Sequence, residues 1–149
     1  MKTAWKAMTK LMILGALAAT PLFAQVIPYS LTFTTSFPFY VGNQYMPAGS
    51  YEVTQPEIDG GTLLMRDMNW RRAEFIGYIP TETLAPVNQG KVTFREYGKV
   101  AFLASFTVTG ETSGALVPPD KREKTIASQV SQEQMSMNSV PLEPTRAGD

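Results

Sequence analysis

Few side chains in this 149-residue chain can take part in catalysis, because the sequence contains no cysteine and no histidine. Their absence excludes cysteine and histidine nucleophiles, histidine general bases, and zinc or copper sites with the usual ligands. Carboxylates remain, and a pair of them at a set separation could hydrolyse a glycosidic bond. The carboxylates considered for this role are Glu52, Asp59, Asp67, Glu74, Glu96 and Glu111.

These acids are better explained as surface groups than as catalysts. Most of them lie in predicted turns or on the polar side of a predicted strand, where solvated carboxylates are common. Asp59 precedes Gly60 and Gly61 and could suggest calcium, but a single acid in a tight turn lacks the several oxygen ligands that this ion needs. The sequence therefore predicts no catalytic residue, no metal site and no cofactor.

The strongest candidates for binding surround Trp70, in the stretch Met68-Asn69-Trp70-Arg71-Arg72. An exposed indole beside guanidinium groups can stack on a sugar ring or anchor a partner protein. The alternative is that Trp70 folds back over the end of the core, because tryptophan is usually mostly buried. Arg95 with Tyr97 is a weaker candidate of the same kind, since aromatic residues in turns often only close a core.

The first 24 residues predict a cleaved signal peptide. Three lysines precede an apolar run from Leu11 to Ala19, and Ala24 offers a small residue for cleavage. The run is shorter than the roughly 20 apolar residues that span a bilayer, and no later segment is long enough. We therefore expect a periplasmic or extracellular protein that starts at Gln25 and has no membrane span.

Cleavage would leave ten basic and thirteen acidic residues, because three of the thirteen basic residues are lost with the signal peptide. The resulting net charge of −3 argues against nucleic acid or an anionic membrane surface as a partner, since both are bound through basic patches. The remaining 125 residues suit one domain of ordinary size. Without cysteine, the core of that domain must hold by packing alone.

Alternating segments predict an all-β domain. From Leu31 to Val41, apolar and polar residues alternate with a period of two, which indicates a half-buried strand with an edge or a bulge at Pro38. From Lys91 to Thr109, two such segments flank a corner at Glu96-Tyr97-Gly98-Lys99 and predict a hairpin. Residues 73–79 carry apolar side chains on both parities, so we expect that strand to be covered on both faces.

The stretch Met46-Pro47-Ala48-Gly49 predicts a tight hairpin between strands at residues 44–46 and 50–55. Pro47 suits the first central position of a type I turn, and Gly49 suits the following corner, where φ must be positive. Further turns are predicted at Gly60-Gly61 and at Gly98.

From these segments we expect a small antiparallel β-sandwich or barrel of about six to eight strands over residues 25–119. Residues 120–149 differ in character. Asp120 followed by Glu123 has the form of a helix capping box, which predicts a short charged helix from Lys121 to about Gln129. Residues 131–149 are rich in Ser, Gln, Met, Asn and Pro, and we expect them to be disordered.

Three segments carry a family resemblance: FYVGNQYMPAGSYEV, VTFREYGKVAFLASFTV and GALVPPDKREK. They resemble a group of small exported β-rich proteins from acidobacterial genomes, mostly of unassigned function, and the resemblance covers residues 30–127. The sequence departs from that group's pattern at Met46, where leucine is usual, at Arg95-Glu96, and at Phe106, where tryptophan is common. The resemblance implies export and a β-rich domain, and it brings no activity with it.

Three functions fit these observations. The first is a non-catalytic exported β module that binds a cell-envelope component, an extracellular ligand or a protein; it agrees with the small size and the lack of a reactive group of residues. The second is a structural or assembly protein that pairs with another chain through strand edges. The third is a hydrolase with an acid pair, which the sequence favours least.

Overall fold

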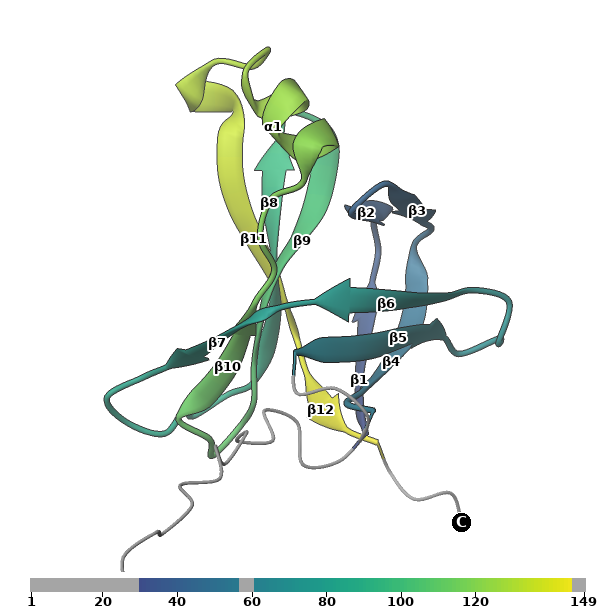
Figure 1. The fold of residues 1–149 in the computed structure, drawn as a ribbon, viewed down its shortest axis with the longest axis vertical. Helices are drawn as coiled ribbons and strands as arrows, with labels where there is room; N and C mark the ends of the chain where they lie inside the picture. The colour runs from purple at the N-terminus through teal and green to yellow at the C-terminus, as the bar shows by residue number, and fades with distance from the viewer. Residues whose placement is uncertain (1–29, 57–60, 146–149) are drawn as a thin grey trace, which may run out of the picture.

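The structure is a computed structural model that describes residues 30–56 and 61–145. Within these two segments it contains twelve strands, one α-helix and one 3-10 helix, so the predicted all-β class is confirmed (Figure 1). The proposed signal peptide at residues 1–24 and the predicted turn residues Asp59 and Gly60 lie outside the described residues.

The first sheet, sheet A, contains five strands, and every neighbouring pair in it is antiparallel. The alternation seen in the sequence decides which side chains face the core. Leu31 and Phe33 are buried, whereas Thr32 and Thr34 point to the opposite face. In order across the sheet, the strands are β12 (Glu143–Pro144), β1 (Leu31–Thr35), β4 (Gly49–Thr54), β5 (Thr62–Asp67) and β6 (Ala73–Gly77).

The second sheet, sheet B, is built around the longest strand of the described residues, β9 (Val100–Thr107). The order across it is β11 (Met135–Pro141), β8 (Lys91–Tyr97), β9, β10 (Ser113–Leu116) and β7 (Ile79–Glu82). A small hairpin of β2 (Phe39–Val41) and β3 (Gln44–Met46) joins it, with β2 parallel to β9. The predicted β8–β9 hairpin is confirmed, and Gly98 supplies a φ of 65° in its two-residue turn.

The two sheets are connected through the chain at both of their edges. β6 continues into β7 through Tyr78, and β11 continues into β12 through Leu142. Both linking side chains are buried, so each crossing is fixed in the core. Strands that pass from one sheet to the other form the corners of a β-sandwich. Figure 1 shows this, with β6 and β7 crossing the front of the molecule.

Aromatic rings from both sheets meet in the core. Phe33 of β1 stacks on Tyr51 of β4 with ring centroids 5.5 Å apart, and it also lies 6.3 Å from Phe94 of β8. Phe39 of β2 packs edge-on against Phe94 at 5.0 Å. Large buried aromatic surfaces contribute strongly to stability, and these contacts hold the two sheets together in a chain that has no cysteine.

The hairpin predicted at Met46-Pro47-Ala48-Gly49 is wrong. β3 pairs with β2, whereas β4 pairs with β1 and β5, so this segment carries the chain from sheet B to sheet A. Positive φ occurs at Gly42, with a value of 56°, and not at Gly49. The tight turn is therefore Gly42-Asn43 between β2 and β3, where a glycine in first position is typical of a two-residue type II′ hairpin.

The C-terminal segment is more ordered than the sequence predicts. The predicted helix is present as α1 (Lys121–Ala127), and Asp120 caps it by accepting a 2.7 Å hydrogen bond from the backbone N–H of Glu123. The predicted disorder is wrong for residues 132–145, which form a 3-10 helix (Gln132–Gln134), β11 and β12. Backbone pairing with β8 and burial of Leu142 order this segment, although it has few apolar side chains.

Candidate functional site

The outer face of sheet A is the side that does not contact the core. Because residues on neighbouring strands lie opposite one another, the side chains on this face form rows that cross the sheet. One row contains Glu143, Thr32, Glu52, Arg66 and Ala73, and the neighbouring row contains Thr54, Leu64 and Phe75.

Trp70 lies in the connection between β5 and β6, and it is 71% exposed. The alternative in which Trp70 closes the end of the core is therefore wrong. Its φ of 59° is unusual for a bulky residue. The turn is fixed by hydrogen bonds from Trp70 N–H to Asp67 C=O at 2.8 Å, from Asp67 N–H to Arg72 C=O at 2.9 Å, and from Asn69 N–H to the Asp67 carboxylate at 2.9 Å.

Arg66 places the indole beside the outer face of sheet A. The Arg66 guanidinium carbon lies 4.8 Å from the centroid of the Trp70 ring. Since Arg66 belongs to a row of that face, the ring in contact with it lies beside the same face, at the end where β5 and β6 are connected. An exposed cation–π contact contributes about 0.5–1 kcal/mol. A guanidinium thus supports the indole, which remains largely accessible.

Phe75 adds a second large exposed aromatic to this face. It is 66% exposed and lies opposite Leu64 of β5. The expectation that residues 73–79 are covered on both faces is wrong, because Ile76 and Tyr78 are buried while Phe75 and Ile79 are exposed. Exposed apolar residues that gather on one face indicate an interaction site more strongly than scattered ones do.

Polar side chains of β1 and β4 adjoin this apolar region. Glu52 accepts a hydrogen bond from the Ser30 hydroxyl, and the hydroxyl oxygens of Thr34 and Ser50 lie 2.8 Å apart. Hydroxyl groups can donate and accept hydrogen bonds, whereas a carboxylate only accepts. The outer face of sheet A therefore has an aromatic half on β5, β6 and their connection, and a polar half on β1 and β4.

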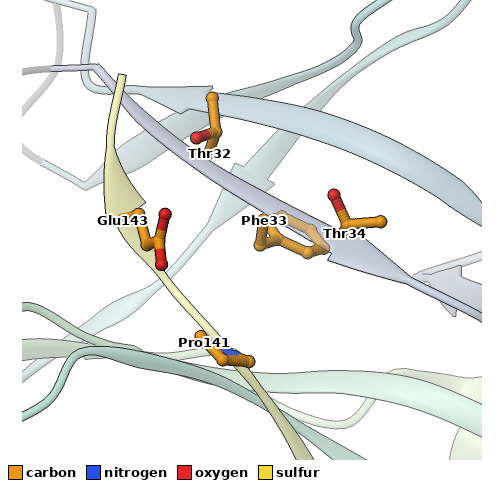
Figure 2. A pocket seen from close by; sticks show the side chains of 5 residues that line it. All are labelled: Thr32, Phe33, Thr34, Pro141 and Glu143. Carbon is orange, nitrogen blue, oxygen red and sulfur yellow. The ribbon is translucent and has the colours of Figure 1, made fainter. Parts of the chain in front are cut away.

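A hollow of about 250 Å³ lies at the β1 side of this face (Figure 2). It forms beyond Thr32, where the pairing of β12 with β1 ends and β11 belongs to the other sheet. A typical ligand pocket measures about 300–1,000 Å³, so this hollow would hold one end of a larger ligand and not the whole of it. The residues that line it are Thr32, Phe33, Thr34, Pro141 and Glu143.

The predicted binding residues fall into two separate places. Arg71 and Arg72 are exposed in the Trp70 connection, but Arg66 is the arginine that contacts the indole. Arg72 donates a 2.8 Å hydrogen bond to the Tyr45 carbonyl and so joins the connection to β3. The other predicted pair, Arg95 and Tyr97, belongs to β8 in sheet B and does not adjoin Trp70 in the strand order.

Arg95 and Tyr97 hold helix α1 against sheet B. The Arg95 guanidinium binds both carboxylate oxygens of Glu123, one of them at 3.0 Å, and also donates to the carbonyls of Val117 and Leu103 at 3.0 and 3.3 Å. The Tyr97 hydroxyl donates to the same carboxylate at 3.0 Å. Burial, together with this hydrogen bond, raises the pKa of Tyr97. These groups bind one another, which favours a structural role over ligand binding.

A second contact joins α1 to the β2–β3 hairpin. The Arg122 guanidinium carbon lies 4.0 Å from the centroid of the Tyr40 ring, and Arg122 donates a 3.3 Å hydrogen bond to the Asn43 side chain. In the structure the helix docks through charged side chains, and this mode of docking leaves no signal in apolar periodicity.

The carboxylates considered for catalysis are dispersed. Asp67 accepts hydrogen bonds within its turn, Glu96 accepts them from Ser136 and Asn138, and Glu52 lies on the outer face of sheet A. Asp59 lies outside the described residues. In residues 30–56 and 61–145, no group of three or more acidic, histidine or cysteine residues could hold a metal ion.

Sequence reasoning missed Arg66, Leu64 and Phe75 as members of the site. A signal was present, because Leu64 and Arg66 share one parity of their strand while Leu63 and Met65 share the other. Assigning the apolar pair to the core leaves Arg66 on the outer face, four residues before Trp70.

The chain matches no protein-family model, and no curated protein or solved structure is significantly similar to it. No helix in the described part of the chain is long and apolar enough to span a membrane.

Proposed function

We propose that this protein is an exported, non-catalytic binding module and that the outer face of sheet A binds a glycan of the cell envelope or the extracellular space. The observation that carries the proposal is the Trp70 indole, which is 71% exposed and supported by Arg66. An exposed tryptophan on a strained backbone conformation stabilises the fold little, and strained residues cluster at functional sites.

A glycan suits both halves of this face. A sugar ring has an apolar C–H surface that stacks on an aromatic ring, and hydroxyl groups at its rim that form hydrogen bonds. Trp70 and Phe75 supply the aromatic surfaces, and the hydroxyls of Thr32 and Thr54 with the Glu52 carboxylate supply polar partners. The face is open, so it would bind along a chain of sugars, with the hollow beside Glu143 at one end.

The test is binding to insoluble polysaccharides, with cellulose, chitin and purified peptidoglycan as probes. We expect the protein to sediment with at least one of them. Trp70→Ala and Phe75→Ala should each weaken that binding by about tenfold or more, which corresponds to the roughly 1.4 kcal/mol or more expected of an aromatic anchor.

Leu84→Ala is the matched control, because Leu84 is fully exposed on the loop that connects β7 and β8, two strands of sheet B. It should leave binding unchanged. If no polysaccharide is bound, or if Trp70→Ala and Phe75→Ala bind as well as the original chain, the proposed function is wrong. Thermal unfolding of each variant shows whether a loss of binding reflects a loss of fold.

Export rests on the three lysines, the apolar run and the small residues at the start of the sequence. Under this proposal the protein acts in the periplasm or outside the cell, and the exported form begins at Gln25. The intact mass of protein recovered from the periplasm and the medium tests this. A retained leader, or a start many residues away, would contradict it.

A further inference from the structure

β11 is an edge strand of sheet B. It pairs with β8 along one side. On the other side its C-terminal end lies near β1, where Pro141 and Thr34 line the hollow described above, while the pairings of the described strands place no partner beside residues 135–139. In Figure 1 it forms one margin of the upper part of the molecule. An exposed strand edge offers unpaired N–H and C=O groups to another strand.

Hydrogen bonds at both ends of β11 determine which backbone groups face β8. Leu142 N–H donates to the Gly90 carbonyl at 3.1 Å, and Gly98 N–H donates to the Gln134 carbonyl at 2.8 Å. Hydrogen-bonded residues alternate along an antiparallel ladder. The even-numbered residues of β11 therefore bond to β8, and the odd-numbered residues direct their backbone groups to the open edge.

The open edge can supply two donors and four acceptors. Pro141 has no N–H, and the N–H of Met135 donates to the Gln132 carbonyl of the preceding 3-10 helix. The donors that remain are the N–H groups of Met137 and Ser139. The acceptors are the carbonyls of Met135, Met137, Ser139 and Pro141.

The other edges are protected, whereas β11 is not. β7 contains Pro80 and Glu82, β6 contains Glu74, and β12 is two residues long and ends in a proline. Such features prevent unwanted pairing of strands. β3 is three residues long, and Arg72 donates to one of its carbonyls. β11 runs for seven residues with no charged side chain, and its proline stands at the last position.

We propose that β11 pairs antiparallel with β11 of a second copy of this chain, giving a two-fold dimer in which the two B sheets are continuous. With Met137 opposite Met137 of the other copy, each Met137 N–H meets a Met137 carbonyl, and each Ser139 N–H meets a Met135 carbonyl. All four free donors are then bonded. The uncharged edge brings no like charges together.

This register also covers an exposed apolar side chain. Met137 is 64% exposed and Met135 is 40% exposed. Their side chains lie on one face of β11, and Ser136 and Asn138, which donate hydrogen bonds to Glu96, lie on the other. Pairing places the two Met137 side chains beside each other. Trp70 and Phe75, which carry the proposed function, take no part in this pairing, so the dimer and the proposed function can each fail without the other.

Molecular mass measured by sedimentation over a wide range of protein concentration tests the proposal. The mass should rise from that of one chain to that of two. Met137→Lys should remain monomeric, because it sets two like charges opposite each other. Ser139→Pro should also remain monomeric, because proline lacks the N–H that bonds to the second copy. The pairing with β8 should persist, since β8 does not use this N–H. Met68→Lys is the control, because Met68 is exposed in the β5–β6 connection and not on β11, and it should dimerise like the original chain.

A single-cysteine variant gives a second measurement that does not depend on disrupting the dimer. Since the chain has no cysteine, Met137→Cys introduces one thiol, and residues paired across strands are close enough for a disulfide. Oxidation should link Met137→Cys into dimers much faster than Met68→Cys. A mass that stays at one chain at every concentration, or equal linking of the two cysteine variants, would overturn the proposal.

Discussion

Arg95 of β8 and Glu123 of α1 bind each other through both carboxylate oxygens, and the Glu123 side chain is 3% exposed. This is the one ion pair in the described residues. Because Arg95 also donates to the carbonyls of Val117 and Leu103, it joins the helix, the strand and the segment that leads to the helix.

Removing the carboxylate should therefore destabilise the protein strongly. Glu123→Ala leaves Arg95 without its partner, and breaking a buried pair by removing one member costs about 3–5 kcal/mol. Urea unfolding measures this cost, and trypsin should cleave the helix at Lys121 or Lys124 sooner. Glu133→Ala is the control, because Glu133 is exposed and should change stability little. Equal stabilities of the two variants would mean that α1 is held by other contacts.

Tyr51 should make stability fall at high pH. Burial, with a smaller effect from the Asp67 charge, raises its pKa from 10.0 to about 12. A group that holds its proton more tightly in the folded state favours folding fully below its unfolded pKa and loses that contribution as the pH rises. Stability should thus decline between about pH 10 and pH 12. Urea unfolding across this range tests the decline.

The same titration can be followed by ultraviolet absorbance. The chain has six tyrosines, and Tyr51→Phe should remove the phenol that ionises near pH 12. It should also reduce the loss of stability above pH 10. An unchanged absorbance titration in Tyr51→Phe would show that another residue ionises there.

Truncation of the chain after Gln129 should prevent stable folding. It removes β11 and β12, exposes the edge of β8, and takes Leu142 out of the core. Truncation after Thr145, which keeps every described strand, should leave the unfolding temperature unchanged. Thermal unfolding followed by circular dichroism compares the two, and a stable protein ending at Gln129 would contradict the role given to β11.

Valine should be tolerated at Gly49 and not at Gly98. Gly98 has a φ of 65°, where a β-branched residue is strained by about 1–2 kcal/mol. Gly49 lies in β4 without positive φ, and a Cβ atom there would meet no other atom within 4 Å. Chemical unfolding of Gly98→Val and Gly49→Val should differ in this direction. Equal losses would contradict the extended conformation of Gly49 in β4.

The sequence predicts the fold class well because strand alternation records burial directly. Leu31 and Phe33 are buried as the period of two requires, and the β8–β9 hairpin turns at Gly98. The alternation does not reveal which strands pair. Pro47 and Gly49 therefore suggested a hairpin where the chain changes sheets, and the Gly42-Asn43 turn went unnoticed.

The candidate site was predictable in its centre and not in its surroundings. Trp70 stood out because an indole in a polar connection is unusual. The neighbours of the indole depend on the register between β5 and β6, which sets Arg66 opposite Ala73 and Phe75 opposite Leu64. Arg95 and Tyr97 looked similar in sequence but found partners on α1, since Glu123 reaches them only through the tertiary fold.

The pairing of β12 with β1 also determines when folding can finish. It sets Thr32 opposite Glu143, two residues 111 positions apart in the chain. Closing so long a loop costs entropy before the contacts repay it, and sheets rich in distant pairings fold slowly, in milliseconds to seconds. β1 has no strand on its second side until β12 has been synthesised. Because synthesis begins at the N-terminus, sheet A stays incomplete until nearly the last described residue has been added.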